Sequence, residues 1–112
     1  MNARNTLSAG CAIALILTGI GIATAAPSQV DIHIFKFRPG QLEVRAGTRV
    51  TWTNQDDITH TVTSGIPERR DGRFDERLEG RGAAASVHFT KPGVYPYFCG
   101  RHPSIRGEIL VN

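Results

Sequence analysis

Beyond residue 25, the chain consists of short segments in which apolar and polar residues alternate. Segments 30–34, 49–53 and 85–90 show this pattern, and turn residues interrupt it roughly every eight to twelve positions. A period of two places successive side chains on opposite faces of a β-strand. The pattern therefore predicts an all-β fold, either a sandwich or a barrel.

Two stretches depart from this alternation. The apolar residues change face between Ile34 and Phe35, which predicts a bulge or a bend in the first strand. Residues 68–82 contain five arginines and five acids, with only Phe74 and Leu78 apolar. We expect a solvated excursion between two strands with one short helical turn; a partner-docking segment is the alternative.

Residues 1–25 have the composition of a secretory signal peptide. Arg4 lies in a polar start, an apolar run follows from about residue 9 to 23, and small residues surround Ala25. The apolar run is shorter than the roughly 18 residues that a membrane-spanning helix needs. We therefore predict cleavage after Ala25, export to the periplasm, and one small domain at 26–112.

The charge of the predicted domain is nearly balanced. Of thirteen Lys and Arg residues only Arg4 precedes residue 26, and all ten Asp and Glu residues follow it. No run of basic residues indicates binding to nucleic acid or to an anionic membrane. We expect a monomer that binds neither.

An unpaired cysteine is the sharpest chemical feature of the chain. Cys11 lies in the predicted signal peptide, which leaves Cys99 as the single thiol of 26–112. Small exported domains usually pair their cysteines, so Cys99 is either inert and buried or held by a ligand. His102 is close enough in sequence to share a metal ion with Cys99, and His60 begins another predicted strand after a polar loop. A thiolate and two imidazoles are the donor set of a blue-copper electron-transfer site.

Two long stretches of the chain read "FKFRPGQLEVRAGTRVTWTNQDDITHTV" and "VHFTKPGVYPYFCGRHPSIRGEILV". Both resemble the cupredoxins, in particular the plastocyanin, pseudoazurin and amicyanin group. The resemblance implies a Greek-key β-sandwich of about seven to eight strands with one type 1 copper at its end. It also implies that His60, Cys99 and His102 are the copper ligands, in a short loop most similar to that of amicyanin.

Ile105 departs from the family pattern, which has an axial methionine at this position. Met1 is the sole methionine of the chain and lies in the predicted signal peptide. Axial identity tunes the reduction potential. We therefore predict a planar three-ligand site with Ile105 non-ligating and a raised potential. A backbone carbonyl in the axial position and loss of copper binding are the alternatives.

Residues around the ligands are also expected to have supporting roles. By the same resemblance, the amide of Thr61 is expected to donate to the sulfur of Cys99, and Asn54 and Asp56 to order the loop before His60. Pro103 lacks an N–H, so it cannot offer the thiolate another hydrogen bond.

The function implied by the resemblance is one-electron transfer by a copper that cycles between Cu(II) and Cu(I). A copper-binding module for trafficking or resistance, without redox cycling, is the alternative, since a three-donor thiolate site can favour Cu(I). An enzyme is not expected, because His33 and His88 occupy alternating polar positions that predict exposure to solvent, too scattered for a further copper cluster.

The expected partner is a redox protein. Arg101 and Arg106 flank His102, so the partner surface is expected to be acidic, with ordinary solvation of the two arginines as the alternative. If electrostatic steering operates, raising the salt concentration slows the reaction between the two proteins.

Overall fold

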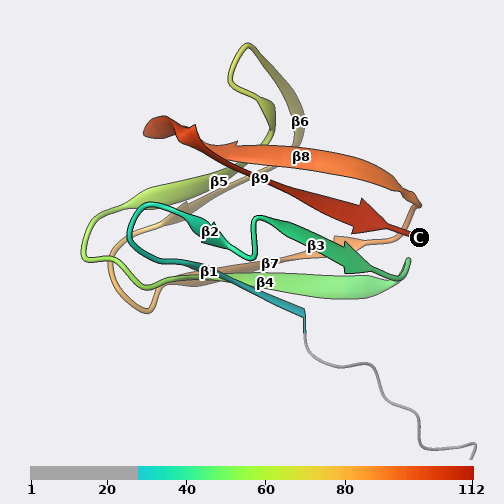
Figure 1. Cartoon of the computed structure of the whole chain (residues 1–112), viewed down its shortest axis with the longest axis horizontal. Coiled ribbons are helices and arrows are strands. Elements are labelled where there is room, and N and C mark those ends of the chain that lie inside the picture. The colour runs from blue at the N-terminus through green and yellow to red at the C-terminus, as the bar shows by residue number, and fades with distance from the viewer. Residues whose placement is uncertain (1–27) are drawn as a thin grey trace, which may run out of the picture.

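The computed structural model describes residues 28–112, which form two packed β-sheets (Figure 1). One sheet has the strand order β2-β1-β4-β7 and the other β3-β9-β8-β5-β6. The strands are β1 (Ser28–Ile32), β2 (Phe37–Arg38), β3 (Gln41–Val44), β4 (Thr48–Asn54), β5 (His60–Ile66), β6 (Arg69–Leu78), β7 (Ala84–Phe89), β8 (Gly93–Cys99) and β9 (His102–Val111).

The predicted all-β sandwich is confirmed, with nine strands in place of the seven to eight expected. Within residues 28–112, no helix has the length and apolar character needed to cross a membrane. The predicted signal peptide and its cleavage site lie outside the described residues.

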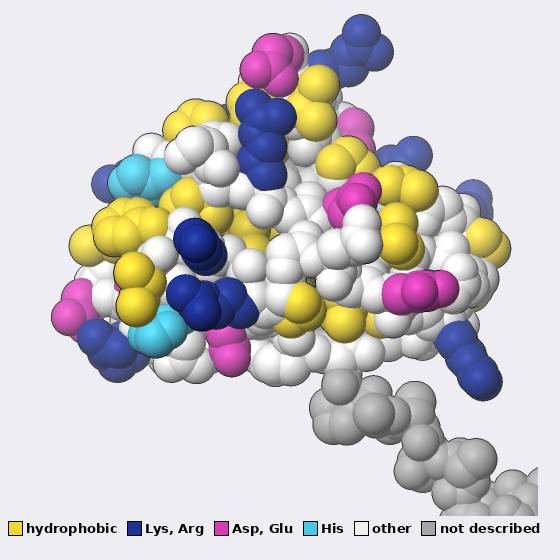
Figure 2. Space-filling view, in the orientation of Figure 1, with side chains coloured by type: hydrophobic (Ala, Val, Ile, Leu, Met, Phe, Trp, Pro, Cys, Tyr) yellow, Lys and Arg dark blue, Asp and Glu magenta, His cyan; other side chains and the backbone are white. Residues whose placement is uncertain are grey.

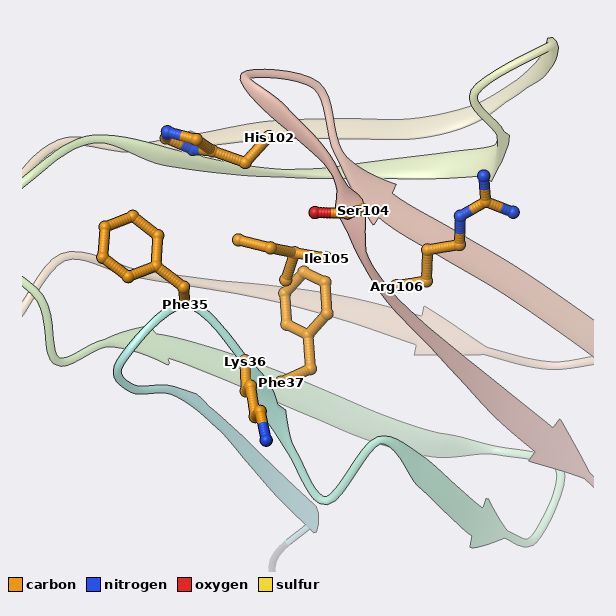
Figure 3. A pocket seen from close by; sticks show the side chains of 7 residues that line it. All are labelled: Phe35, Lys36, Phe37, His102, Ser104, Ile105 and Arg106. Carbon is orange, nitrogen blue, oxygen red and sulfur yellow. The ribbon is translucent and has the colours of Figure 1, made fainter.

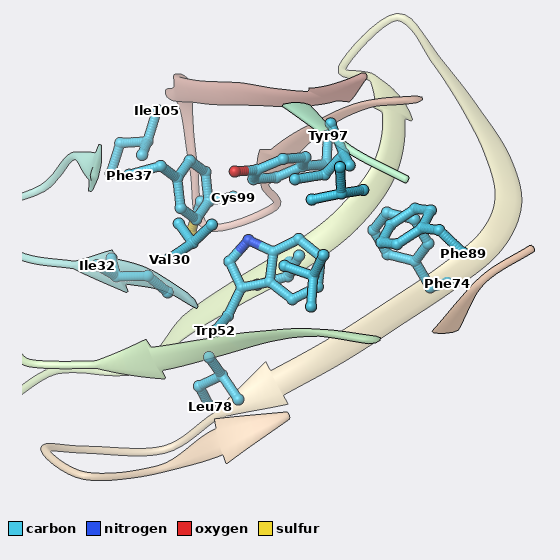
Figure 4. Packing of buried hydrophobic residues seen from close by; sticks show 14 of the residues in the cluster. Val30, Ile32, Phe37, Trp52, Phe74, Leu78, Phe89, Tyr97, Cys99 and Ile105 are labelled. Atoms are coloured by element: carbon cyan, nitrogen blue, oxygen red, sulfur yellow. The ribbon is translucent and has the colours of Figure 1, made fainter. Parts of the chain in front are cut away.

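Aromatic rings fill the space between the two sheets (Figure 4). Trp52 of β4 is fully buried, and its ring centroid lies 5.3 Å from that of Tyr97, 5.9 Å from Phe74 and 6.3 Å from Phe89. Burial alternates along β4, as the period-two pattern predicted. Burial of these large apolar surfaces is the main stabilising contribution to the sandwich.

The expectation of a solvated excursion over 68–82 was wrong. Residues Arg69–Leu78 form β6, which pairs antiparallel with β5 along a hairpin that projects from the sandwich (Figure 1). Phe74 and Leu78 are buried in the core, while most of the charged side chains of β6 are exposed. A spacing of four residues lies on one face of a strand and also on one face of a helix. The two apolar residues alone could therefore not identify the strand.

Tyr97 lies in the core with its hydroxyl buried and without a hydrogen-bond partner among residues 28–112. Burial raises the pKa of Tyr97 to about 12, above the value near 10 in an unfolded chain. The folded state therefore favours the neutral phenol. The stabilising contribution of the neutral phenol to the free energy of unfolding is fully present below pH 10 and is lost as the pH rises towards 12.

We expect Tyr97→Phe to leave stability at pH 7 nearly unchanged and to protect the fold at alkaline pH. The protection amounts to about 2 kcal/mol at pH 12, measured as the free energy of urea unfolding from pH 8 to 12. Tyr95→Phe is the control, because the Tyr95 hydroxyl is exposed and donates to the Lys91 carbonyl at 2.7 Å. Parallel pH profiles for wild type and Tyr97→Phe would contradict the prediction.

Candidate metal centre

The three candidate ligands meet at one end of the sandwich, where three strands begin or end. His60 is the first residue of β5, Cys99 the last of β8 and His102 the first of β9. Cys99 and His102 face each other across a tight turn formed by Gly100 and Arg101. One ligand atom from each of the three residues lies within 4.8 Å of the others.

The donor atoms are largely withdrawn from water and point at one another. His60 and Cys99 are fully buried, and the Cys99 Sγ lies 3.6 Å from the His60 Nδ1. The Nδ1 of His102 is buried and has no hydrogen-bond partner among the described residues. A buried nitrogen without a partner is costly, and a metal ion in this position would remove that cost.

Asp56 orients the ring of His60 from the opposite side. Its Oδ2 lies 2.9 Å from the His60 Nε2. If His60 donates its proton there, the Nδ1 keeps its lone pair directed towards Cys99. Two neutral imidazole nitrogens and a thiolate form a donor set that suits copper. The described residues therefore fit the metal that the resemblance implies.

Thr61 contacts the thiol with its backbone and the following turn with its side chain. The Thr61 amide donates to the Cys99 Sγ at 3.4 Å, and its hydroxyl accepts from the Gly100 amide at 2.7 Å. The hydroxyl also lies 2.9 Å from that of Thr63, which donates to Asp75 at 2.8 Å. Thr63 and Asp75 were missed from sequence, because their link depends on β6 pairing with β5.

Asn54 holds the loop that presents His60. It is fully buried, and its side-chain amide donates to the Ile58 carbonyl at 2.7 Å and to the Leu78 carbonyl at 3.1 Å. Its Oδ1 accepts from the Asp56 amide at 2.9 Å. These bonds connect the loop to the end of β6.

Asp56 does more than order the loop. Besides contacting His60, its carboxylate accepts hydrogen bonds from the amides of Ile34 at 2.8 Å and Phe35 at 3.2 Å. Partial burial raises the pKa of Asp56, but the hydrogen bonds from Ile34, His60 and Phe35 outweigh burial and hold it below 3.8. The residue is therefore an anion at neutral pH that joins two segments.

Ile34 and Phe35 form a turn, where the sequence predicted a bulge or bend. The chain reverses between His33 and Lys36, whose amides and carbonyls bond reciprocally at 2.9 and 3.2 Å. Strands β1 and β2 pair antiparallel on either side. Two-residue hairpin turns usually contain Gly or Asn. Neither residue type occurs at Ile34 or Phe35, so the reversal of the chain was not predicted from the sequence.

Ile105 lies beside the ligands with an apolar side chain. It is 6% exposed and belongs to the core cluster. With His102 it lines an open cavity of about 570 Å³ (Figure 3). The other lining residues are Phe35, Lys36, Phe37, Ser104 and Arg106.

The surface around the cluster is partly apolar and partly basic (Figure 2). Arg101 and Arg106 are exposed, and Arg106 lies 3.8 Å from Glu68, which offsets part of its charge. Pro103 is also exposed, and its carbonyl accepts from the Arg106 Nε at 3.3 Å.

The remaining two histidines are separate from the cluster. His33 and His88 are both exposed, and the His88 Nε2 contacts the Gly47 carbonyl at 3.0 Å. The group of possible metal ligands found within residues 28–112 is formed by His60, Cys99 and His102.

Known proteins of similar sequence and structure bear directly on this centre. The family model of copper-binding proteins of the plastocyanin/azurin family matches residues 25–112. Amicyanin-alpha of Methylorubrum extorquens is 33% identical over 98 residues, which cover 86% of this chain and 81% of the relative. Amicyanin of Paracoccus denitrificans is 32% identical over 83 residues, which cover 74% and 63%.

Two solved structures share the architecture. A purple cupredoxin from Nitrosopumilus maritimus has a TM-score of 0.70 and 29% identity, covering 76% of this chain and 99% of that one. A methionine-to-alanine variant of amicyanin in the Cu(I) form has a TM-score of 0.69 and 28% identity, covering 81% and 87%. With a donor set that suits copper, the chain belongs to the plastocyanin/azurin family of copper-binding proteins.

Proposed function

We propose that this protein is a periplasmic one-electron carrier with one type 1 copper bound by His60, Cys99 and His102. The observation that carries the proposal is the convergence of two imidazole nitrogens and one thiol within 4.8 Å, with His60 and Cys99 fully buried. The match to amicyanins and plastocyanins supports the same function. When bound, the copper supplies the change between Cu(II) and Cu(I).

The chain itself supplies a fixed and sheltered donor set. The ligands lie on the ends of three strands of the five-stranded sheet, whose pairing holds their backbone, so they need little rearrangement when the charge of the site changes. The bonds from Thr61 and Asp56 hold the sulfur and the imidazole in place. His102 is the partly exposed ligand, and we propose that electrons leave through its edge.

The proposed partner is a redox protein whose surface accepts the apolar area around His102. Arg101 and Arg106 favour an acidic surface on that partner, although Glu68 lies near Arg106. Export to the periplasm rests on the predicted signal peptide, and an enzymatic role is not part of the proposal.

Visible absorption and EPR test the function directly. The metal-free protein is given one equivalent of Cu(II), and an intense thiolate-to-copper band that bleaches with ascorbate is the expected result. A further redox titration should show reversible one-electron behaviour. Failure to bind copper in either oxidation state would refute the proposal.

Copper trafficking without redox cycling is the second candidate, and the apolar side chain of Ile105 is the observation that favours it. Without an axial sulfur, the thiolate and imidazoles can favour Cu(I). The loaded protein is mixed with an apo copper acceptor and, separately, with a redox partner. Transfer of copper supports trafficking, whereas transfer of an electron with copper retained supports the carrier.

Ile105→Met is expected to lower the reduction potential. A thioether next to the copper would stabilise Cu(II) relative to Cu(I). A tenfold shift in that preference corresponds to about 59 mV for one electron, which redox titration resolves. Ile105→Leu, which adds no donor, is the control and should stay near wild type. A higher potential for Ile105→Met than for wild type would refute the three-ligand interpretation.

A further inference from the structure

The backbone conformation of the turn at Ile34 and Phe35 is unfavourable for these two residue types. Their φ angles are +51° and +57°, in the left-handed region. A β-branched or bulky residue with positive φ is a true outlier, whereas Asn and Gly adopt this conformation readily. Such outliers persist where the surroundings hold them in place, and they cluster at functional sites.

Burial in the core does not account for this choice of residues. The side chain of Ile34 is 61% exposed and that of Phe35 is 49% exposed. The turn is held instead by the Asp56 carboxylate, which accepts from both backbone amides and also contacts His60. The position of the turn is therefore tied to the position of a candidate ligand.

The ring of Phe35 packs against both candidate histidines. Its centroid lies 5.6 Å from that of His60 and 5.4 Å from that of His102, at interplanar angles of 87° and 82°. The two histidine rings lie 5.6 Å apart. Edge-to-face packing of this kind is favourable and directional. The three rings thus restrain one another.

Phe35 also borders the open cavity next to Ile105 (Figure 3). The cavity is large enough to admit water and small anions, and Lys36 and Arg106 at its walls carry positive charge. The Phe35 ring lies at the end of this cavity where His102 also lies (Figure 3). Removing the ring would therefore enlarge the open space next to both imidazoles.

We propose that Phe35 is a positioning residue of the metal centre, whose ring fixes both ligand imidazoles and closes the side of the site next to Ile105 to water and small anions. This inference rests on the proposed copper function. It explains why the turn keeps a phenylalanine where glycine or asparagine would suit the backbone. The ring positions the imidazoles, although a bulky residue with positive φ strains the turn.

Opposite effects on stability and on the site follow from this role. Phe35→Gly and Ile34→Asn both relieve a positive φ and should raise the midpoint of thermal unfolding of the metal-free protein. Phe35→Gly should also disturb the site, whereas Ile34→Asn, which leaves the Phe35 ring in place, is the matched control. Phe35→Tyr keeps the ring and should restore the wild-type site.

The experiment compares these variants with wild type in two forms of the full chain. In the metal-free form, ¹⁵N NMR of the His60 and His102 imidazoles should show broadened or shifted signals in Phe35→Gly alone. In the Cu(II) form, azide is the probe, read by visible absorption and EPR. We expect azide to bind Phe35→Gly at least about tenfold more tightly than wild type, Ile34→Asn or Phe35→Tyr.

Unchanged imidazole signals and an unchanged azide response in Phe35→Gly would overturn the proposal, as would equal changes in Ile34→Asn. A Phe35→Gly protein less stable than wild type would assign the ring a structural role and also overturn it. If the wild-type protein binds no copper, the proposed function fails. The imidazole signals of the metal-free proteins then still decide the role of Phe35.

Discussion

Cys99→Ser is expected to abolish the intense visible absorption of the Cu(II) protein and to weaken copper binding by more than about 100-fold. Loss of a residue that merely supports a metal ligand typically costs 10- to 100-fold in affinity, and loss of the thiolate itself removes a ligand. Serine has nearly the same size as cysteine, but its hydroxyl is not ionised at neutral pH and is a harder donor. Cys99 is fully buried, so water cannot readily take its place.

Competition with a chelator of known copper affinity measures the loss, and absorption spectra of both oxidation states follow the chromophore. His88→Gln serves as the control, because His88 is exposed and lies outside the cluster. It should bind copper as wild type does. A Cys99→Ser protein that kept the charge-transfer band would exclude the thiolate as the source of colour.

Gly65→Ala is expected to destabilise the fold by about 3 kcal/mol. Gly65 lies at the irregularity in the pairing of β5 with β6 and has a φ of +103°. A Cβ at this position would lie 2.5 Å from the Arg69 carbonyl oxygen, 2.8 Å from the Asp71 amide nitrogen and 2.9 Å from the Arg70 Cα. All three are backbone atoms of the paired strand, so a side chain cannot move aside to relieve the contact.

Gly72→Ala separates the cost of the backbone conformation from that of the contact. Gly72 is in β6 and has a φ of +73°, but nothing lies within 4 Å of a Cβ built there. The Gly72→Ala variant should therefore lose only about 1 kcal/mol in the free energy of unfolding. For a domain of this size, each kcal/mol shifts the thermal midpoint by about 4–8 °C, so calorimetry resolves the two variants. Equal losses would show that the β5–β6 hairpin adapts to the added methyl group.

The β5–β6 hairpin also matters for the metal centre. The Leu78 carbonyl accepts from the Asn54 side chain, and Asp75 accepts from Thr63, which contacts Thr61. Loosening β6 should therefore loosen both the loop before His60 and the turn after Cys99. Strand β6 was not predicted from sequence, and its support for the site was missed with it.

Local patterns in the sequence were sufficient for the fold class and for the candidate ligands. Alternation of apolar and polar residues depends only on neighbouring positions, and it predicted the buried face of β4. The spacing of Cys99 and His102 places the two residues opposite each other on either side of one tight turn. The unpaired thiol in a chain predicted to be exported, with His60 at the start of a predicted strand, then indicated a shared metal.

Only the tertiary structure decided which residues hold those ligands. Asp56 reaches the turn amides from 21 and 22 residues away, and Phe35 reaches two histidines on other strands. The pairing that makes β6 a strand likewise comes from β5 and not from its own charged sequence. Such contacts depend on the register and the direction of side chains from distant strands. Local periodicity carries no information about either.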